Sequence, residues 1–420
     1  MRILLVNHYA GSPRHGMEFR PYYLAREWVR AGHEVTIVAA SYSHVRAVQP
    51  QVPGHPVEEI IDGIRYRWLP VPQYAGNGMG RLRNILSFLR QLRADAWRLT
   101  REIRPDAVIA SSTYPMDVWV ARKLAKLAKP ERAPGAVGPS RAKLVYEVHD
   151  LWPLSLIELS GMSPRHPFAM LCGKAEADAY RDADVVVSML PCVHDHMASR
   201  GLDLRKLHIV PNGFAPEEWQ GESAPLGETL RAHLDAERAA GRVVVGYAGS
   251  MGLPNALDVL LDAAAKLKDS PLSFVLVGSG HEAARLAERA TAEGLSNVRF
   301  FAPIPKAQIP TLLSHFDIAY IGWQRTPIYR FGIAPNKLID YLMAGRAVLH
   351  SVEAGNDPVA DANAGLTVPP EDAEAVAQGL LKLAALSPQQ RSEMGQRGRA
   401  FAMAHHAFPV LAEKFIKALS

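Results

Sequence analysis

The sequence predicts an α/β protein made of two Rossmann-like, doubly wound domains in tandem, and three observations support this prediction. Strand-like apolar runs alternate with helix-length amphipathic segments almost from end to end, a pattern typical of parallel sheets. A polar segment rich in Pro and Glu at 215–226 interrupts the alternation, which then restarts. The length of 420 residues corresponds to about two or three domains.

The first domain is assigned to residues 1–214. Its first strand is followed by a helix at 17–32, which ends at Gly32, a residue suited to a left-handed C-cap. The strands expected in this domain are residues 2–7, 33–40, 106–112, 143–150 and 183–189.

The second domain is assigned to residues 227–420, and its last helix is expected to pack back on the first domain. Its expected strands are residues 242–250, 272–280, 297–304, 316–322 and 347–351, and its expected helices are residues 255–267, 281–293, 335–344 and 371–420. Two such domains facing each other leave a cleft at the carboxyl ends of their strands, where open α/β sheets bind ligands. Residues just after strands are therefore the candidate functional residues.

Composition excludes several classes of protein. A content of 48% hydrophobic and 21% charged residues excludes wholesale disorder, and no apolar run of 18 or more residues predicts a transmembrane helix. The apolar start of the chain lacks a small-residue cleavage site, so it predicts a strand rather than a signal peptide. Two cysteines, Cys172 and Cys192, cannot build a disulfide framework or a four-thiolate zinc site, which indicates a cytoplasmic protein.

The net charge of +5 is unevenly distributed along the chain. Residues 1–215 carry 28 Lys and Arg against 20 Asp and Glu, whereas residues 216–420 carry 19 against 22. An anionic surface is therefore expected to meet the first half. Nucleic acid is not expected as a partner, because the chain has no Lys/Arg block, zinc-finger spacing or ribonucleoprotein aromatic motif.

Five short motifs carry a resemblance to a known family. They are the Gly-containing loop at 10–16, YEVHDLWP at 146–153, IVPNGF at 209–214, LVGSG at 276–280 and APNKLIDYLMAGRAVL at 334–349. In this order the chain resembles the family-4 glycosyltransferases over nearly its whole length. The resemblance implies the GT-B fold, with two domains facing across a cleft, and a retaining, metal-independent transfer. Segments 7–25 and 335–345 are most similar to bacterial O-antigen and capsule enzymes of the N-acetyl-fucosamine transferase type.

The donor site is expected in the second domain. A helix start at 334–345 offers backbone amides to a diphosphate, and Asn336 and Lys337 lie in its first turn. The resemblance places Asp340 at the second acidic position of the family's Glu-x7-Glu motif, where it would accept hydrogen bonds from the ribose. An ordinary solvated lysine and a first-turn acid favoured by the helix dipole are the alternatives for these two residues. Gly249 and Ser250, which end a strand, complete the predicted nucleotide-binding set.

The sequence departs from the family in two places. Gly332 occupies the first acidic position of the motif, and the segment 249–258 lacks the family's Arg and Lys after the first strand of this domain. Arg330 is the predicted catalytic replacement, with Arg325 in the same loop as a further candidate. The alternative is that both are exposed loop arginines.

The first domain supplies the remaining predicted site residues. The resemblance implies that the Gly16 amide contacts the donor phosphate and that His149 hydrogen-bonds the donor hexose, while the leaving phosphate acts as base. The alternatives are a flexible loop and a structural histidine. Glu18 is predicted either to bind acceptor hydroxyls or to cap a helix, and Asp150 to fix the His149 tautomer or to cap a turn.

No metal site is predicted. Asp182 and Asp184 match an Asp-x-Asp metal signature, but they precede a strand instead of following one, which predicts a helix-to-strand turn. His194, Asp195 and His196 are predicted to lie on a helix surface, because alternate residues do not share a helix face.

The segment 80–104 carries seven arginines and two acids on an amphipathic helical pattern. Its apolar stripe is expected to pack on the sheet, while the arginines, Phe88 and Trp97 face outward to an inner-membrane surface. An ordinary packed helix is the alternative.

Together these features predict a cytoplasmic, peripheral membrane enzyme of lipopolysaccharide or O-antigen synthesis. It is expected to transfer a hexose, an N-acetylated amino sugar, from a UDP-sugar to a lipid-linked or glycan acceptor without cofactor or metal. Two alternatives stay open: a nucleotide-sugar 2-epimerase, and a non-catalytic GT-B subunit that binds a nucleotide sugar.

Overall fold

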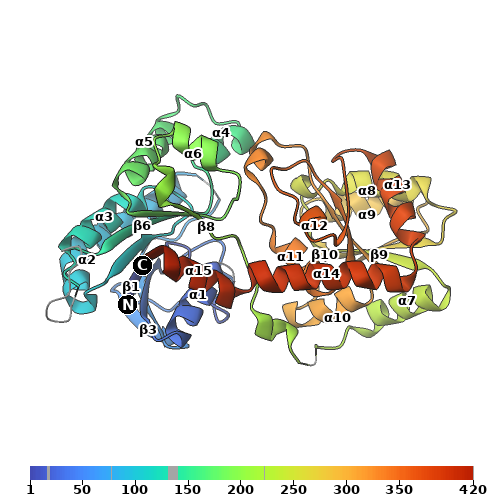
Figure 1. Ribbon diagram of the computed structural model, residues 1–420, viewed down its shortest axis with the longest axis horizontal. Helices are drawn as coiled ribbons and strands as arrows, with labels where there is room; N and C mark the ends of the chain where they lie inside the picture. The colour runs from blue at the N-terminus through green and yellow to red at the C-terminus, as the bar shows by residue number, and fades with distance from the viewer. Residues whose placement is uncertain (17–18, 77, 131–140, 222, 420) are drawn as a thin grey trace. The chain divides into compact units, whose positions relative to one another are not determined.

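The computed structural model describes residues 1–16, 19–76, 78–130, 141–221 and 223–419. The chain divides into two compact units (Figure 1). Unit 1 comprises Met1–Asn212 and Phe408–Ser420, and unit 2 comprises Gly213–Ala407.

Unit 1 is built on one sheet with the strand order β3-β4-β2-β1-β5-β6-β7-β8. Only β3 pairs antiparallel with its neighbour, and the other described pairs are parallel. The strands are β1 (Arg2–Val6), β2 (Glu34–Ala40), β3 (Val57–Ile61), β4 (Ile64–Leu69), β5 (Ala107–Ala110), β6 (Lys143–Val148), β7 (Val185–Ser188) and β8 (Leu207–Ile209). The nearly continuous burial of β1, β5, β6 and β7 is typical of a parallel sheet covered on both faces.

The β3–β4 hairpin was not predicted from the sequence, although the sequence contains its signal. Asp62 and Gly63 form the two-residue turn, and both have positive φ angles of 50° and 81°. Asp-Gly at a two-residue connection is a strong hairpin signal, because both positions of the turn need that conformation.

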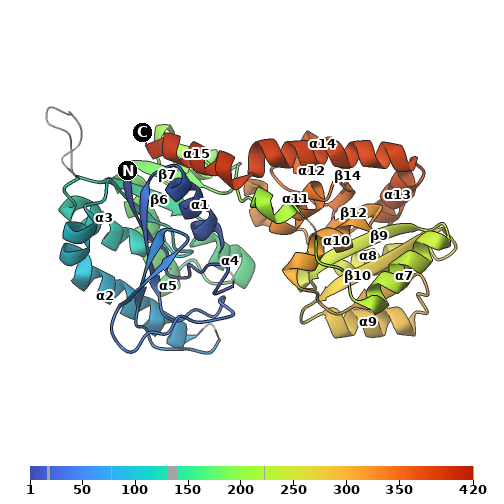
Figure 2. The same cartoon turned by 90° about the horizontal axis from the view of Figure 1, so that it is seen from below.

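Helices cover both faces of the unit 1 sheet. They are α1 (Phe19–Arg30), α2 (Met79–Ile103), α3 (Asp117–Leu127), α4 (Leu154–Ser160), α5 (Pro167–Asp182), α6 (His194–Ser199) and α15 (Phe408–Leu419). Figures 1 and 2 show α15, the C-terminal helix, beside α1. Trp28 Nε1 donates to the Ala412 carbonyl over 3.2 Å, and the rings of Tyr23 and Phe408 stack at 4.8 Å. The C-terminus of the chain thus completes the core of unit 1.

Helix α2 turns different residues outward from those expected. Phe88, expected on the outer face, is buried, with its ring 4.7 Å from that of His8. The expectation was wrong because the buried stripe runs through Ile85, Phe88, Leu92, Ala96 and Leu99, at regular helical spacing. Trp97 is 61% exposed, as expected, and Leu86 is 54% exposed.

Unit 2 holds a second sheet, parallel throughout its described pairs, with the strand order β11-β10-β9-β12-β13-β14. This is the 3-2-1-4-5-6 order of a Rossmann fold, whose ligands bind at the carboxyl ends of the strands. The strands are β9 (Val243–Ser250), β10 (Leu272–Ser279), β11 (Val298–Phe301), β12 (Ile318–Gly322), β13 (Ala347–Ser351) and β14 (Gly365–Val368).

Two apolar clusters, one around Leu338, Leu342 and Phe316 and one around Leu260, Phe274 and Leu380, form the unit 2 core. The helices are α7 (Glu228–Ala239), α8 (Leu257–Lys266), α9 (Ala283–Ala292), α10 (Ile309–Ser314), α11 (Asn336–Met343), α12 (Pro358–Asp361), α13 (Ala373–Ala384) and α14 (Pro388–His406). The last of these begins at a capping box formed by Ser387 and Gln390. Among the described residues, no helix has both the length and the apolar character needed to cross a bilayer.

Candidate active site

His149 follows β6 at the carboxyl edge of the unit 1 sheet and lies in a buried hydrogen-bond network. Its Nε2 lies 3.0 Å from Ser111 Oγ and 3.4 Å from Glu147 Oε2, and the Ser111 hydroxyl donates to that Glu147 oxygen over 2.6 Å. Because Ser111 gives its own proton to Glu147, its oxygen accepts from His149, which places a proton on Nε2. Glu147 and Ser111 therefore contact and orient the Nε2 side of the imidazole. The sequence had suggested Asp150 as the residue that fixes the tautomer.

Arg20 anchors this network from the first turn of α1. Its Nε donates to Glu147 Oε1 over 3.0 Å, and its terminal nitrogens donate to the Val210 and Pro211 carbonyls over 2.8 and 2.6 Å. Burial alone would raise the pKa of Glu147, but the Arg20 guanidinium and the bonds from His149 and Ser111 lower that pKa to about 2. The Glu147 carboxylate is therefore ionised, and Arg20 serves as its buried counter-ion.

The loop at 10–16 is anchored to the domain by its own hydrogen bonds. Tyr66 Oη donates to the Gly11 carbonyl over 2.8 Å, and Ser12 Oγ lies 2.9 Å from His15 Nδ1. Gly16 has a φ of +65°, and a Cβ there would lie 3.0 Å from the Ala47 Cβ, so this position requires glycine. Glu18, the predicted acceptor-binding residue, lies outside the described residues.

Lys337 extends from the first turn of α11 to the end of β9. Its Nζ donates to Tyr247 Oη and, over 2.9 Å, to Asn255 Oδ1, and it lies 4.0 Å from the centre of the Tyr247 ring. No carboxylate in the described part of the chain pairs with this ammonium group. Burial among neutral partners lowers the pKa of Lys337 to about 7.

Gly249 makes the path of Lys337 possible. A Cβ at Gly249 would lie 2.7 Å from Lys337 Cε, and Gly249 has a φ of +142°. The segment 249–258 has no Arg or Lys of its own. Lys337 thus brings a cation from another element to the loop that lacks one.

Asp340 lines a cavity of about 450 Å³ on unit 2. One part of its wall is apolar, with Trp219, Ile309 and Pro310. Asp340 and the ion pair of Lys306 with Glu218, at 2.7 Å, provide the charged groups. Burial raises the pKa of the Asp340 carboxyl to about 7, although Lys306 acts in the opposite direction. The cavity therefore combines an apolar surface with a carboxyl group that changes charge near neutral pH.

The structure places the other predicted unit 2 residues as follows. Arg330 donates to the Pro327 carbonyl over 2.6 Å, and its guanidinium lies 4.2 Å from the Phe331 ring. Arg325 pairs with Glu353 at 3.2 Å. Asn336 and Ser250 are exposed at the start of α11 and the end of β9.

Gly332, at the first acidic position of the Glu-x7-Glu motif, has a φ of +98°, a backbone conformation that favours glycine. Residues with a Cβ rarely adopt this backbone conformation, so an acid at this position would be strained. The backbone beside it is held by Asn356, whose Oδ1 accepts from the Ile333 N–H over 2.7 Å.

No group of three or more His, Cys, Asp or Glu side chains with metal-binding geometry occurs among the described residues. Asp182 ends α5 and Asp184 directly precedes β7, so the predicted helix-to-strand turn is confirmed. His194 begins α6, and His196 lies 3.9 Å from a Glu176 oxygen.

Several residues of these networks were not predicted from the sequence. Glu147 had a signal, since a lone acid inside an apolar strand requires a buried partner. Tyr247 and Asn255 had none, because only the fold brings them to Lys337. Trp219 lies in the segment interpreted as a linker, and in the structure it lines the Asp340 cavity.

Two family models match consecutive parts of the chain and together span most of it. The first describes a glycosyl transferase 4-like domain and matches residues 15–213. The second describes the glycosyl transferases group 1 and matches residues 242–385.

Individual proteins are also similar to this chain over most of its length. The putative colanic acid biosynthesis glycosyl transferase WcaI of Escherichia coli K12 is 24% identical over 377 residues, which cover 84% of this chain and 85% of WcaI. Sucrose-phosphate synthase of Thermosynechococcus elongatus superposes with a TM-score of 0.69 at 17% identity, covering 99% of this chain and 97% of that one. Anabaena HepE in complex with UDP and glucose superposes with a TM-score of 0.65 at 15% identity, covering 100% and 99%.

We predict that Glu147→Gln destabilises unit 1 by about 3–5 kcal/mol, because the change leaves the buried Arg20 charge without its counter-ion. The free energy of unfolding in urea, followed by tryptophan fluorescence, measures this loss. Glu34→Gln, the same change at an exposed strand end, is the control and should alter stability by less than about 0.5 kcal/mol.

The same ion pair predicts a pH dependence with a definite sign. The pKa of Glu147 is lower in the folded than in the unfolded chain, so its contribution to stability is present above the unfolded pKa of about 4.5 and is lost as the pH falls towards 2. Glu147→Gln should remove this component of acid unfolding. An equal loss of stability in both Gln variants would contradict the role given to the pair.

Proposed function

Because the chain belongs to the family-4 GT-B glycosyltransferases, it is a hexosyltransferase, and we propose that it transfers the sugar of a UDP-sugar to a lipid-linked or glycan acceptor in bacterial surface polysaccharide synthesis. The observation that supports this proposal most strongly is the placement of Lys337 and Asp340 on the same helix, α11. One presents a cation at the end of β9, and the other lines a nucleoside-sized cavity.

The donor binds unit 2 in this proposal. The Lys337 ammonium, which has no carboxylate partner among the described residues, neutralises the diphosphate together with the backbone amides at the start of α11. The Asp340 carboxylate accepts hydrogen bonds from the ribose hydroxyls, and the base occupies the apolar part of the cavity near Trp219. HepE, which shares the fold, binds UDP and glucose, and WcaI is assigned to colanic acid synthesis, which favours a UDP-sugar and a polysaccharide product.

The transfer retains configuration and uses no protein nucleophile. The bond between the anomeric carbon and the diphosphate oxygen breaks, and the acceptor oxygen forms its bond on the same face of the sugar. The acceptor proton passes to the leaving phosphate. Lys337 stabilises the charge that develops on the diphosphate, and His149, held through Nε2 by Ser111 and Glu147, positions the hexose. Because Lys337 supplies this positive charge, transfer proceeds without a divalent metal.

The sugar is an N-acetylated amino sugar in this proposal, since segments 7–25 and 335–345 resemble N-acetyl-fucosamine transferases. The acceptor reaches the enzyme at a membrane. The exposed face of α2 carries apolar and basic side chains in turn, at helical spacing: Met79, Arg83, Leu86, Arg90, Arg93, Trp97 and Arg101. The Arg101 guanidinium lies 4.4 Å from the Trp97 ring. A face of this composition suits the interface of an anionic bilayer.

Donor turnover is the test of the central proposal. A panel of UDP-, GDP- and dTDP-sugars is assayed with EDTA for release of the nucleotide in the presence of a lipid-linked acceptor. We expect turnover with a UDP-sugar that EDTA leaves unchanged. Lys337→Met should lower kcat/KM by about 10- to 150-fold, since a charge-assisted hydrogen bond contributes about 1.5–3 kcal/mol. Lys268→Met, at an exposed lysine of the same unit, is the control. Turnover that requires Mn²⁺ or Mg²⁺ would contradict the metal-free mechanism.

The two perturbed groups on α11 predict a bell-shaped pH dependence of donor affinity. Above pH 7 the free protein must take up a proton on Lys337 to bind the diphosphate, and below pH 7 it must release one from Asp340 to bind the ribose. The affinity for a UDP-linked N-acetylated amino sugar should therefore fall on both sides of neutrality, by up to about tenfold per pH unit. Calorimetry measures the dissociation constant at each pH. The phosphates of this donor stay ionised over the whole range, so the profile reports on the protein groups.

Lys337→Met should flatten the alkaline side of this profile, and Asp340→Asn should flatten the acidic side. The Lys268→Met control should keep both sides. A profile that keeps its full shape in both α11 variants would exclude these residues from the donor site.

The α2 face predicts salt-sensitive membrane binding. Arg83, Arg90 and Arg93 changed together to Gln should weaken co-sedimentation with phosphatidylglycerol vesicles at low salt, since each basic residue near an anionic surface contributes about 1 kcal/mol. Trp97→Ala should weaken it at every salt concentration. A triple Gln variant at Arg231, Lys268 and Lys382, three exposed basic residues of unit 2, is the matched control. Wild-type protein that stays in the supernatant at low salt would exclude this role for α2.

A further inference from the structure

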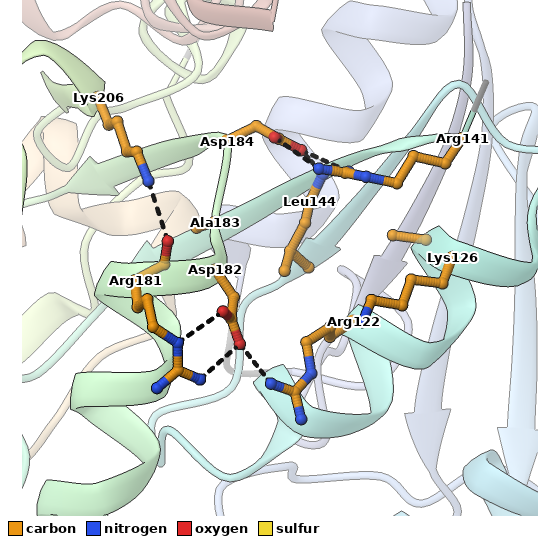
Figure 3. Close-up of a pocket in the computed structure, with 10 residues that line it drawn as sticks. Arg122, Lys126, Arg141, Leu144, Arg181, Asp182, Ala183, Asp184 and Lys206 are labelled. Atoms are coloured by element: carbon orange, nitrogen blue, oxygen red, sulfur yellow. Dashed lines mark hydrogen bonds and ion pairs between the residues drawn. The ribbon is translucent and has the colours of Figure 1, made fainter. Parts of the chain in front are cut away.

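A cationic pocket of about 470 Å³ lies at the amino edge of the unit 1 sheet (Figure 3). Arg122 and Lys126 reach it from the last turns of α3, and Arg181 from the end of α5. Arg141 precedes β6 and Lys206 precedes β8. His149 follows the carboxyl end of the same β6, so the pocket and His149 lie at opposite edges of one sheet. The pocket is therefore separate from the residues assigned to catalysis.

The lining of the pocket has more positive than negative charge. Five basic side chains, from Arg122, Lys126, Arg141, Arg181 and Lys206, surround two acids, Asp182 and Asp184, which leaves a formal surplus of three positive charges. Arg181 also pairs at 2.8 Å with Asp178, which lies outside the pocket lining, so local pairing reduces the surplus without cancelling it. Lys206 Nζ donates to a backbone carbonyl, that of Arg181, over 3.1 Å, and no ion pair to Lys126 occurs within the described ranges.

The two acids fix the guanidinium groups in place. Asp182 accepts from Arg181 Nε over 2.9 Å and also from Arg122, so one carboxylate holds two arginines. Asp184 binds both terminal nitrogens of Arg141 over 2.7 and 2.8 Å and accepts from the Leu144 N–H over 2.7 Å. Each guanidinium has five N–H groups, and these pairs engage only some of them. The arginines are thus oriented while retaining donor capacity.

Simple surface ion pairs do not account for this arrangement. Helix-to-strand turns need no more than one counter-ion for each acid, whereas here five cations surround one hollow, as Figure 3 shows for the side chains of α3, α5 and the strand starts. Their mutual repulsion favours an anion in the hollow. Arginine forks and lysine ammonium groups together are the usual recognition set for phosphate oxygens.

We propose that this pocket is a second anion site, distinct from the donor site, and that it binds a phosphate-bearing ligand. The positive surplus complements the negative charge of a phosphate or diphosphate near neutral pH. The phosphate belongs either to a small soluble compound or to the headgroup of an anionic lipid, and both offer the pocket the same oxygens. The proposal does not depend on the identity of the sugar donor.

The test compares two double variants of equal charge. Lys126→Gln with Lys206→Gln removes two pocket cations that form no ion pair with the acids. Lys123→Gln with Lys414→Gln removes two lysines, on α3 and α15, that do not line the pocket and form no ion pair among the described residues. Both proteins are titrated with sodium diphosphate by calorimetry, with sodium chloride at matched ionic strength, and are co-sedimented with vesicles of phosphatidic acid in phosphatidylcholine. Thermal unfolding confirms that both variants are folded.

We expect the pocket variant to bind diphosphate at least about tenfold more weakly than the control variant, because a charge-assisted contact contributes about 1.5–3 kcal/mol. A loss confined to the vesicles, without diphosphate binding by either protein, would identify a lipid headgroup as the source. UDP-sugar turnover should be equal in the two variants, which separates this result from the donor site. Equal diphosphate and vesicle binding by the two variants would overturn the proposal.

Discussion

A buried ammonium group surrounded by neutral partners is the constraint on which the unit 2 site depends. Lys337 Nζ contacts a hydroxyl, an amide oxygen and the face of Tyr247, and this environment favours the uncharged amine. An anion placed beside the ammonium reverses the preference. The same constraint determines Gly249, because any larger residue would meet the lysine side chain. Lys337 on α11 therefore supplies the positive charge that the loop after β9 lacks.

The buried charge of unit 1, on Glu147, differs from that of Lys337 because it has a counter-ion inside the protein. The Glu147 carboxylate has its counter-ion in Arg20 and further donors in Ser111 and His149, so it needs no ligand to be stable in its ionised form. A fully satisfied network holds its members rigidly. His149 is thus presented in one orientation and with its proton on Nε2. Glu147 thus has its counter-ion within unit 1, whereas Lys337 has no carboxylate partner among the described residues.

The order of strands and helices could be predicted because alternation of apolar and amphipathic segments is a local property. Lys337 and Asp340 could also be placed in the first turns of one helix, since Pro335 and the residues after it carry a helix-start pattern. What the sequence did not contain locally was the direction in which each side chain points. The sequence pattern predicts an outward Phe88, whereas the packing of α2 buries it. Asn255 meets Lys337 only because the fold brings the end of β9 close to α11.

Asp182 and Asp184 show why a motif must be judged by what surrounds it. Two acids separated by one residue match a metal signature, yet within the described ranges their carboxylates contact only arginine side chains and a backbone N–H. Acids outnumbered by guanidinium groups do not attract a cation, because the local field is already positive. Their effect is instead to hold arginines around a hollow whose net charge favours an anion. The sign of the ligand's charge is thus determined by all the residues that α3, α5 and the strand starts bring together. The Asp182 and Asp184 pair alone does not determine it.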